Sequence, residues 1–169
     1  MFNVKKLAFG AAMLAASAVC FAAPKVEIVT SEGNIVVNLN EKAAPTTVAN
    51  FVKYAKEGFY NGTIFHRVIN NFMIQGGGFD RNLHQKSTHA PIKLEDKNGL
   101  KNTVGTIAMA RTNNPDSATS QFFINLKDND FLNGTSTKDG YAVFGEVVTG
   151  MDVVRKIGRA PTGSKGFMD

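Results

Sequence analysis

The sequence predicts a mainly β protein, a closed or nearly closed antiparallel barrel with two helices. Short stretches of alternating hydrophobic and polar residues recur along the chain, and only two stretches have helical spacing. Polar loops separate these stretches, as is typical of barrels. The chain has thirteen phenylalanines and no tryptophan, so we expect an aromatic core.

The first 23 residues have the layout of a secretory signal peptide. Two lysines give a positive start, residues 7–19 form an uncharged and mostly apolar run, and Ala22 and Ala23 supply the small residues of a cleavage site. The run is shorter than the roughly 20 residues that span a bilayer as a helix. We therefore expect cleavage without stable membrane insertion, one domain over residues 24–169, and a periplasmic or secreted location.

The composition of the mature chain excludes several classes of function. Cys20 is the only cysteine and lies in the predicted signal peptide, so the mature protein has no disulfide and no thiol nucleophile. Loss of the signal peptide lowers the formal charge from +5 to about +3. Because no run of basic residues is interleaved with aromatic residues, we expect no nucleic-acid binding. About 146 residues remain, which is enough for one well-buried core.

The first elements of the mature chain are a predicted hairpin and a helix. Residues 26–30 alternate in polarity, residues 31–34 form a turn, and residues 35–39 resume the alternation. The pattern then changes to helical spacing. Pro45 suits the first turn of this helix, and Gly58 lies where the spacing ends.

The remaining elements follow the same criteria, with strand patterns rich in β-branched and aromatic residues. The predicted strands are residues 63–69, 72–75, 106–110, 121–126 and 141–148, and the second helix is residues 151–157. The three glycines at 76–78 lack the following lysine and helix of a phosphate-binding loop. We expect them to bend the backbone.

Several polar residues could suggest other chemistry, and each has a simpler interpretation. His66 precedes Arg67 on a strand and faces the other way, which favours a buried, hydrogen-bonded histidine over a general base. His84 and His89 lie in a polar loop without a metal-ligand pattern. Residues 128–130 alternate oxygen ligands but lack the later glycine and glutamate of a calcium loop. We expect no metal and no cofactor.

Five blocks in a fixed order carry a family resemblance that covers nearly all of the mature chain. They are FHRVI (65–69), FMIQGG (72–77), GTIAMA (105–110), SQFFI (120–124) and VFG (143–145). In this order and at these intervals they resemble the cyclophilin family of peptidyl-prolyl cis-trans isomerases. The segments ART (110–112) and GYA (140–142) resemble its bacterial exported branch.

The resemblance implies an eight-stranded antiparallel closed barrel with two capping helices and a proline-binding groove on its outer face. Members of the family continue past the stretch like residues 165–169 into a final strand, and we expect this chain to lack that strand. A missing strand would leave an unpaired edge that is open to added strands.

The resemblance also implies the residues of the site. Arg67 matches the catalytic arginine of the family. The substrate-binding positions are the proline-pocket residues Phe72, Met73, Phe123 and Leu132, the backbone-holding residues Gln75, Gln121, Ala110 and Arg111, and the groove residues Phe131 and Tyr141. Many cyclophilins have tryptophan at the position of Phe131 and histidine at that of Tyr141. We therefore expect weak cyclosporin binding.

The implied chemistry needs no nucleophile, metal or cofactor. Rotation about a peptide bond has a barrier of about 18–20 kcal/mol because its C–N bond has partial double-bond character. A charged donor such as Arg67 can stabilise the twisted state, in which the prolyl nitrogen gains a lone pair. The expected substrates are proline-containing segments of unfolded or partly folded exported proteins, and the protein is expected to be a monomer.

Two other functions stay open. A proline-peptide binding module or holdase chaperone would use the same pocket without turnover. A structural partner in an envelope complex would instead use the loops at residues 78–103 and 127–140.

Overall fold

The computed structural model of this protein describes residues 23–164, which contain seven strands, two α-helices and one short 3₁₀-helix. The strands are β1 (Lys25–Thr30), β2 (Gly33–Leu39), β3 (Arg67–Ile69), β4 (Met73–Gly76), β5 (Thr106–Met109), β6 (Phe122–Asn125) and β7 (Val143–Thr149). The helices are α1 (Pro45–Lys56), η1 (Asp130–Leu132) and α2 (Met151–Gly158). The predicted signal peptide and Cys20 lie outside the described residues, except for Ala23. No helix within residues 23–164 has the length and apolar character needed to cross a membrane.

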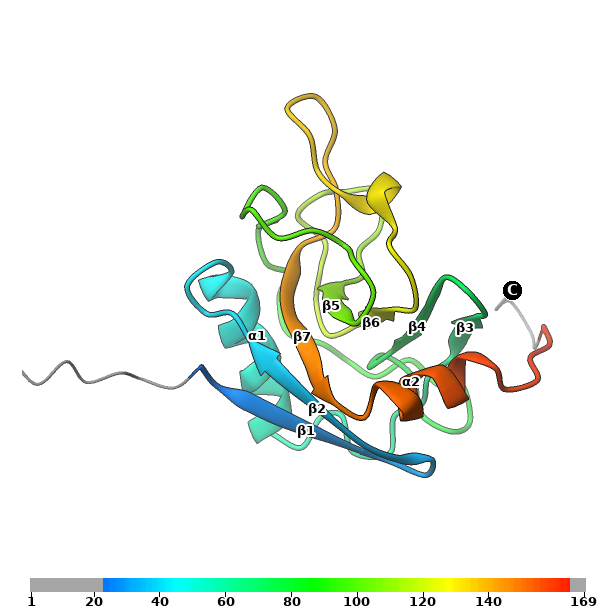
Figure 1. Ribbon diagram of the computed structural model, residues 1–169. Helices are drawn as coiled ribbons and strands as arrows, with labels where there is room; N and C mark the ends of the chain where they lie inside the picture. The colour runs from blue at the N-terminus through cyan, green and yellow to red at the C-terminus, as the bar shows by residue number, and fades with distance from the viewer. Residues whose placement is uncertain (1–22, 165–169) are drawn as a thin grey trace, which may run out of the picture.

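The strands form one curled antiparallel sheet in the order β1-β2-β7-β5-β6-β4-β3 (Figure 1). A closed barrel would require the two outer strands, β1 and β3, to be joined by a strand that pairs with both. Within residues 23–164 no strand joins them, so the expectation of an eight-stranded closed barrel is not met. Among the described residues the sheet is an open half-barrel with β1 and β3 at its unpaired edges.

The first hairpin forms where the alternating pattern predicts it. Thr30 opposes Gly33 across the turn, and the Thr30 hydroxyl donates a hydrogen bond to the Gly33 carbonyl oxygen at 2.7 Å. Gly33 has φ +132°, a value that favours glycine. In β2 the residues Ile35, Val37 and Leu39 are fully buried and alternate with partly exposed ones, which fixes the face that meets the core.

Two predicted strands begin two or more residues later in the structure, because their first residues have other partners. The strand expected from residue 63 begins at Arg67, and Thr63 makes only a single bridge to Asp80. Gly77, with φ +84°, turns the chain out of β4 and leaves residues 63–66 without a ladder. The strand expected from residue 141 begins at Val143, because the Tyr141 amide donates to the Leu132 carbonyl instead.

The N-terminus of α1 is capped by a residue far away in the sequence. Proline opens the helix as predicted, but Ala44 at the N-cap position has no side chain that could accept a hydrogen bond. The Glu95 carboxylate takes this role. It accepts hydrogen bonds from the Thr47 amide at 2.6 Å, the Thr47 hydroxyl at 2.7 Å and the Thr46 amide at 3.3 Å. The negative charge also suits the helix dipole.

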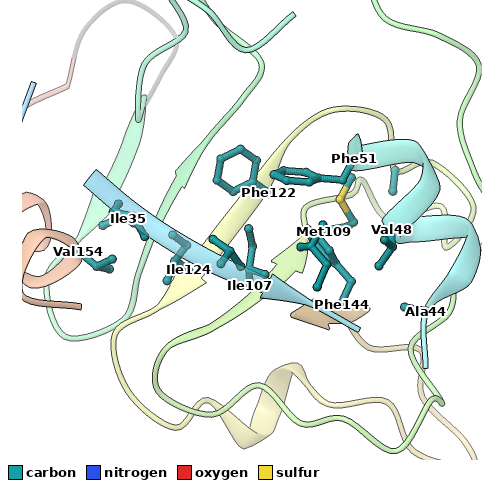
Figure 2. Packing of buried hydrophobic residues seen from close by; sticks show 14 of the residues in the cluster. Ile35, Ala44, Val48, Phe51, Ile107, Met109, Phe122, Ile124, Phe144 and Val154 are labelled. Carbon is teal, nitrogen blue, oxygen red and sulfur yellow. The ribbon is translucent and has the colours of Figure 1, made fainter. Parts of the chain in front are cut away.

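The main hydrophobic core lies inside the curl of the sheet, with one helix at each end (Figure 2). Figure 2 shows Val154 of α2 beside Ile35 at one end and Val48 and Phe51 of α1 at the other. The aromatic rings expected from the composition pack here, with Phe51 5.2 Å from Phe144 and 5.4 Å from Phe122 between ring centroids.

Candidate active site

Four neighbouring strands carry two hydrophobic clusters, one on each face of the sheet. Strand alternation directs Ile74, Ile107, Ile124 and Phe144 into the main core. On each strand, a residue next to these points to the opposite face. A second buried cluster there consists of Leu132 together with Met73 (β4), Phe123 (β6), Ala108 (β5) and Val143 (β7). Alternation alone gave no means of distinguishing these faces in the sequence. The structure assigns Met73 and Phe123 to the outer face.

A single row of directly opposed residues crosses this outer face. It consists of Arg67 (β3), Gln75 (β4), Phe123 (β6), Ala108 (β5) and Val143 (β7). Directly opposed residues point to the same face of a sheet. The row begins at the β3 edge with an exposed arginine and continues over a buried apolar floor.

The apolar floor has a wall that comes from outside the sheet. The short helix η1 follows β6 and presents Leu132 to the second cluster. Phe131, 59% exposed, stacks on Phe72 with ring centroids 5.6 Å apart. Phe72 packs against the same cluster. All four predicted pocket residues, Phe72, Met73, Phe123 and Leu132, therefore lie together, with Phe131 at their exposed rim.

Polar side chains lie beside the row and bind one another. The Gln75 amide Nε2 donates to the Gln121 side-chain oxygen at 2.9 Å, and the Ala110 backbone amide donates to the Gln121 carbonyl at 3.0 Å. Gln121 packs over Gly78, where an added Cβ would lie 2.5 Å from its Cγ. The glycines at 76–78 thus bend the backbone, as expected, and also leave space for Gln121.

The Arg111 side chain links two loops and supports Tyr141, a role that the sequence did not indicate. Its guanidinium donates to the carbonyl oxygens of Gly140 at 2.9 Å, Thr112 at 2.8 Å and Asp139 at 3.1 Å. It lies 4.6 Å from the centroid of the Tyr141 ring, a favourable cation-π distance. Tyr141 in turn meets Phe123 edge to face at 5.7 Å.

His66 differs in part from its prediction. Its ring is half-buried against Phe79, with centroids 4.5 Å apart, but Nδ1 is buried with no hydrogen-bond partner among the described residues. The expected hydrogen bond is therefore not seen at this nitrogen. Burial lowers the pKa of His66 below its ordinary value, and the neighbouring charge of Arg67 lowers it further.

Three asparagines beneath the wall were missed in the sequence. Asn102, Asn125 and Asn129 are each at most 1% exposed. The sequence offered one signal, at Asn125. This residue lies two positions after Phe123 on the same face of the strand, so a polar side chain interrupts an apolar face.

Other regions of the described chain do not assemble comparable chemistry. Residues 23–164 contain no group of histidine, cysteine, aspartate or glutamate side chains that could hold a metal ion. A cleft of about 560 Å³ lies beside β2 and β7 and is lined by Asn38, Lys42, Lys101 and Glu146 among others. It contains none of the predicted site residues.

The sequence matches the family described as cyclophilin type peptidyl-prolyl cis-trans isomerase/CLD over residues 25–168. It is 58% identical to a peptidyl-prolyl cis-trans isomerase of Acinetobacter baylyi over 164 residues, covering 97% of this chain and 87% of the relative. It is 61% identical to peptidyl-prolyl cis-trans isomerase B of Escherichia coli over 141 residues, covering 82% of this chain and 86% of the relative.

The fold is similar to that of a solved isomerase. The crystal structure of a Cryptosporidium parvum cyclophilin type peptidyl-prolyl cis-trans isomerase, determined in the presence of the dipeptide Ala-Pro, has a TM-score of 0.71 and 27% identity. The similarity covers 83% of this chain and 88% of the solved chain.

Proposed function

This chain belongs to the cyclophilin family of peptidyl-prolyl cis-trans isomerases, and on that premise we propose that its substrates bind along the outer row, with Arg67 as the catalytic residue. The isomerase activity follows from the family and from relatives that carry its name. The observation that carries the assignment of the site is the row itself, because it joins an exposed cation to an apolar floor across five strands.

The apolar part of the row suits the pyrrolidine ring of a substrate proline. Met73, Phe123 and Leu132 are each at most 9% exposed and offer a buried apolar surface. The ring gains free energy when this surface removes it from water. The pocket thereby fixes one side of the prolyl bond.

The polar groups suit the peptide chain on either side of the ring. Gln75 lies between Arg67 and Phe123 in the row, and its side chain is hydrogen-bonded to that of Gln121. Together with the backbone at Ala110 and Arg111, they would hold the flanking peptide while the carbonyl side rotates.

Arg67 suits the chemical step because its interaction with the substrate changes along the reaction. In the planar amide the nitrogen lone pair is delocalised, and in the twisted state it becomes available to a donor. The guanidinium remains protonated and presents a rigid array of N–H donors. An interaction that is stronger in the twisted state than in the planar state raises the rate.

The wider role that we propose is isomerisation of prolyl bonds in exported proteins. The support is the signal-peptide layout of residues 1–23 and the resemblance of residues 110–112 and 140–142 to the exported branch. Because Phe131 replaces the tryptophan of many relatives, cyclosporin would bind weakly.

The test is NMR exchange spectroscopy of a short Ala-Pro peptide, with the amide shifts of the protein recorded in the same titration. We expect catalytic amounts of protein to accelerate cis-trans exchange, and the peptide to shift the amides of Gln75, Phe123 and Ala110. Accelerated exchange with shifts elsewhere would refute the proposed site. Shifts at these amides without accelerated exchange would instead favour a peptide-binding module or holdase.

A further inference from the structure

A connected chain of four asparagine side chains lies beneath the wall of the apolar pocket. The asparagine chain consists of Asn102, Asn125, Asn129 and Asn133. Asn125 Nδ2 donates to Asn102 Oδ1 at 3.1 Å, and Asn129 Nδ2 donates to Asn125 Oδ1 at 2.8 Å. Asn133 Oδ1 accepts from the Asn102 amide at 2.7 Å and from its Nδ2 at 3.1 Å.

The asparagine chain holds the main chain of three residues that line the groove. Asn129 Nδ2 donates to the Phe72 carbonyl at 3.0 Å. Asn102 Nδ2 lies 3.3 Å from both the Leu132 carbonyl and the Tyr141 carbonyl. These three residues come from three separate segments of the sequence, and none of them belongs to a strand.

The backbone hydrogen bonds of the loop run through the same asparagines. The Asn129 amide donates to the Asn102 carbonyl at 2.8 Å, and the Leu132 amide donates to the Asn129 carbonyl at 2.9 Å. The short helix η1, which carries Phe131 and Leu132, is therefore anchored at its start through Asn129. A network with this many buried partners fixes one arrangement of its loops.

Only the N–H groups of the Asn129 side chain are hydrogen-bonded. Its Oδ1 is buried without a hydrogen-bond partner among the described residues, which costs free energy. Its Nδ2, by contrast, donates to the Phe72 carbonyl oxygen and to Asn125 Oδ1. The side-chain amide therefore acts through its N–H groups, which bind the main chain of Phe72 and the rest of the asparagine chain.

We propose that the asparagine chain is the positioning device of the proline pocket, setting the distance between its wall and the Met73/Phe123 floor. This inference rests on the pocket assigned above and adds residues to it that do not touch the substrate. Arg67 lies on the β3–β4 ladder, which has its own backbone pairing. Disturbing the asparagine chain should therefore weaken peptide binding without slowing the rotation step.

Asn133 gives the cleanest test, because it is half-buried at the end of the asparagine chain and acts there through its side-chain oxygen. Asn133→Ala removes that acceptor. Asn133→Asp retains an oxygen in its place but loses the Nδ2 donor that reaches Asp130 Oδ1 at 3.3 Å, so it is combined with Asp130→Asn to avoid two adjacent carboxylates. We expect Asn133→Ala to raise KM for an Ala-Pro peptide about fivefold, equivalent to one net hydrogen bond. The value of kcat should stay within about twofold of wild type. The double variant Asn133→Asp/Asp130→Asn should restore most of the wild-type KM.

Two further variants separate positioning from general stability and from the pocket assignment. Val154→Ala, in the main core on α2, destabilises the fold without touching the pocket and should leave KM unchanged. Phe123→Ala tests the pocket itself. If Phe123→Ala raises KM and Asn133→Ala does not, the positioning role is refuted while the pocket stands. If neither changes KM, the pocket assignment fails.

An equal rise of KM in Val154→Ala and Asn133→Ala would also overturn the proposal, because loss of stability would then explain both. The deeper variant Asn129→Ala should show the same separation of KM from kcat, if it folds. The Asn133 pair decides the question without it.

Discussion

Replacement of Arg67 should separate catalysis from stability in this protein. The side chain is exposed at the β3 edge, and none of the ion pairs within residues 23–164 includes it. A surface residue of this kind changes the free energy of unfolding by about 0.5 kcal/mol or less when replaced. Its donors nevertheless lie at the end of the row that we assign to the prolyl bond.

The expected loss of activity is much larger than this loss of stability. Removing one preorganised donor from a reacting centre costs on the order of 2.7–4 kcal/mol, so Arg67→Ala should lower kcat/KM by about 100- to 1,000-fold. Arg67→Lys keeps the charge but loses the planar fork, so its kcat/KM should lie between those of wild type and Arg67→Ala. Arg155→Ala, another exposed arginine but on α2, is the matched control and should retain wild-type activity.

The assay is cis-trans exchange of an Ala-Pro peptide by NMR, together with urea unfolding of each variant. Wild-type kcat/KM in a folded Arg67→Ala protein would refute the role of the arginine. A loss of activity accompanied by a large loss of stability would refute the premise that the side chain is structurally free.

Three further predictions follow from contacts outside the row. Glu95→Ala should lower the free energy of unfolding by about 2 kcal/mol in urea denaturation, because α1 loses its cap. Glu95→Gln should lower the free energy of unfolding less, since it keeps an acceptor. Equal decreases in the two variants would contradict this account. Because the folded-state pKa of His66 lies below its ordinary value of 6.5, the unfolded chain binds its proton first. Stability should therefore fall as the pH drops through that value, and His66→Gln should flatten the decrease in Tm between pH 7.5 and 5, roughly the window around it. Gly78→Ala should displace Gln121, break its bond to Gln75 and weaken peptide binding, and an unchanged dissociation constant would count against this packing.

The order of the strands along the chain and their approximate bounds could be predicted, because local alternation of hydrophobic and polar residues indicates that one face of a strand is buried. Closure of the sheet could not, because it depends on a contact between the two edges, β1 and β3, which no local pattern describes. The cap of α1 was missed for the same reason. Glu95 lies 48 residues from Thr47, and a carboxylate in a polar loop gives no sign of its partner.

The candidate site was predicted through the family resemblance, which named residues on six separated segments of the chain. In the structure Phe72, Met73, Phe123 and Leu132 lie together. Alternation alone could not predict this, because it identifies the residues that share a face of a strand but not what that face packs against. The contacts of the Arg111 side chain and the asparagine chain were missed. Both bind main-chain carbonyls, and such acceptors are the same at every residue. Apart from the polar Asn125 on the apolar face of β6, no sequence pattern therefore indicates these contacts.

The opposed faces of β6 have a consequence for how this protein can change. Phe123 and Ile124 are adjacent in sequence, yet Phe123 belongs to the cluster on the outer face and Ile124 to the main core. Loss or gain of a single residue within β4, β5 or β6 would exchange the two sets of side chains and abolish folding and binding together. Substitutions at alternate positions can alter the groove and leave the interior intact. Peptide preference can therefore diversify through point changes on one face, while the lengths of these strands remain fixed.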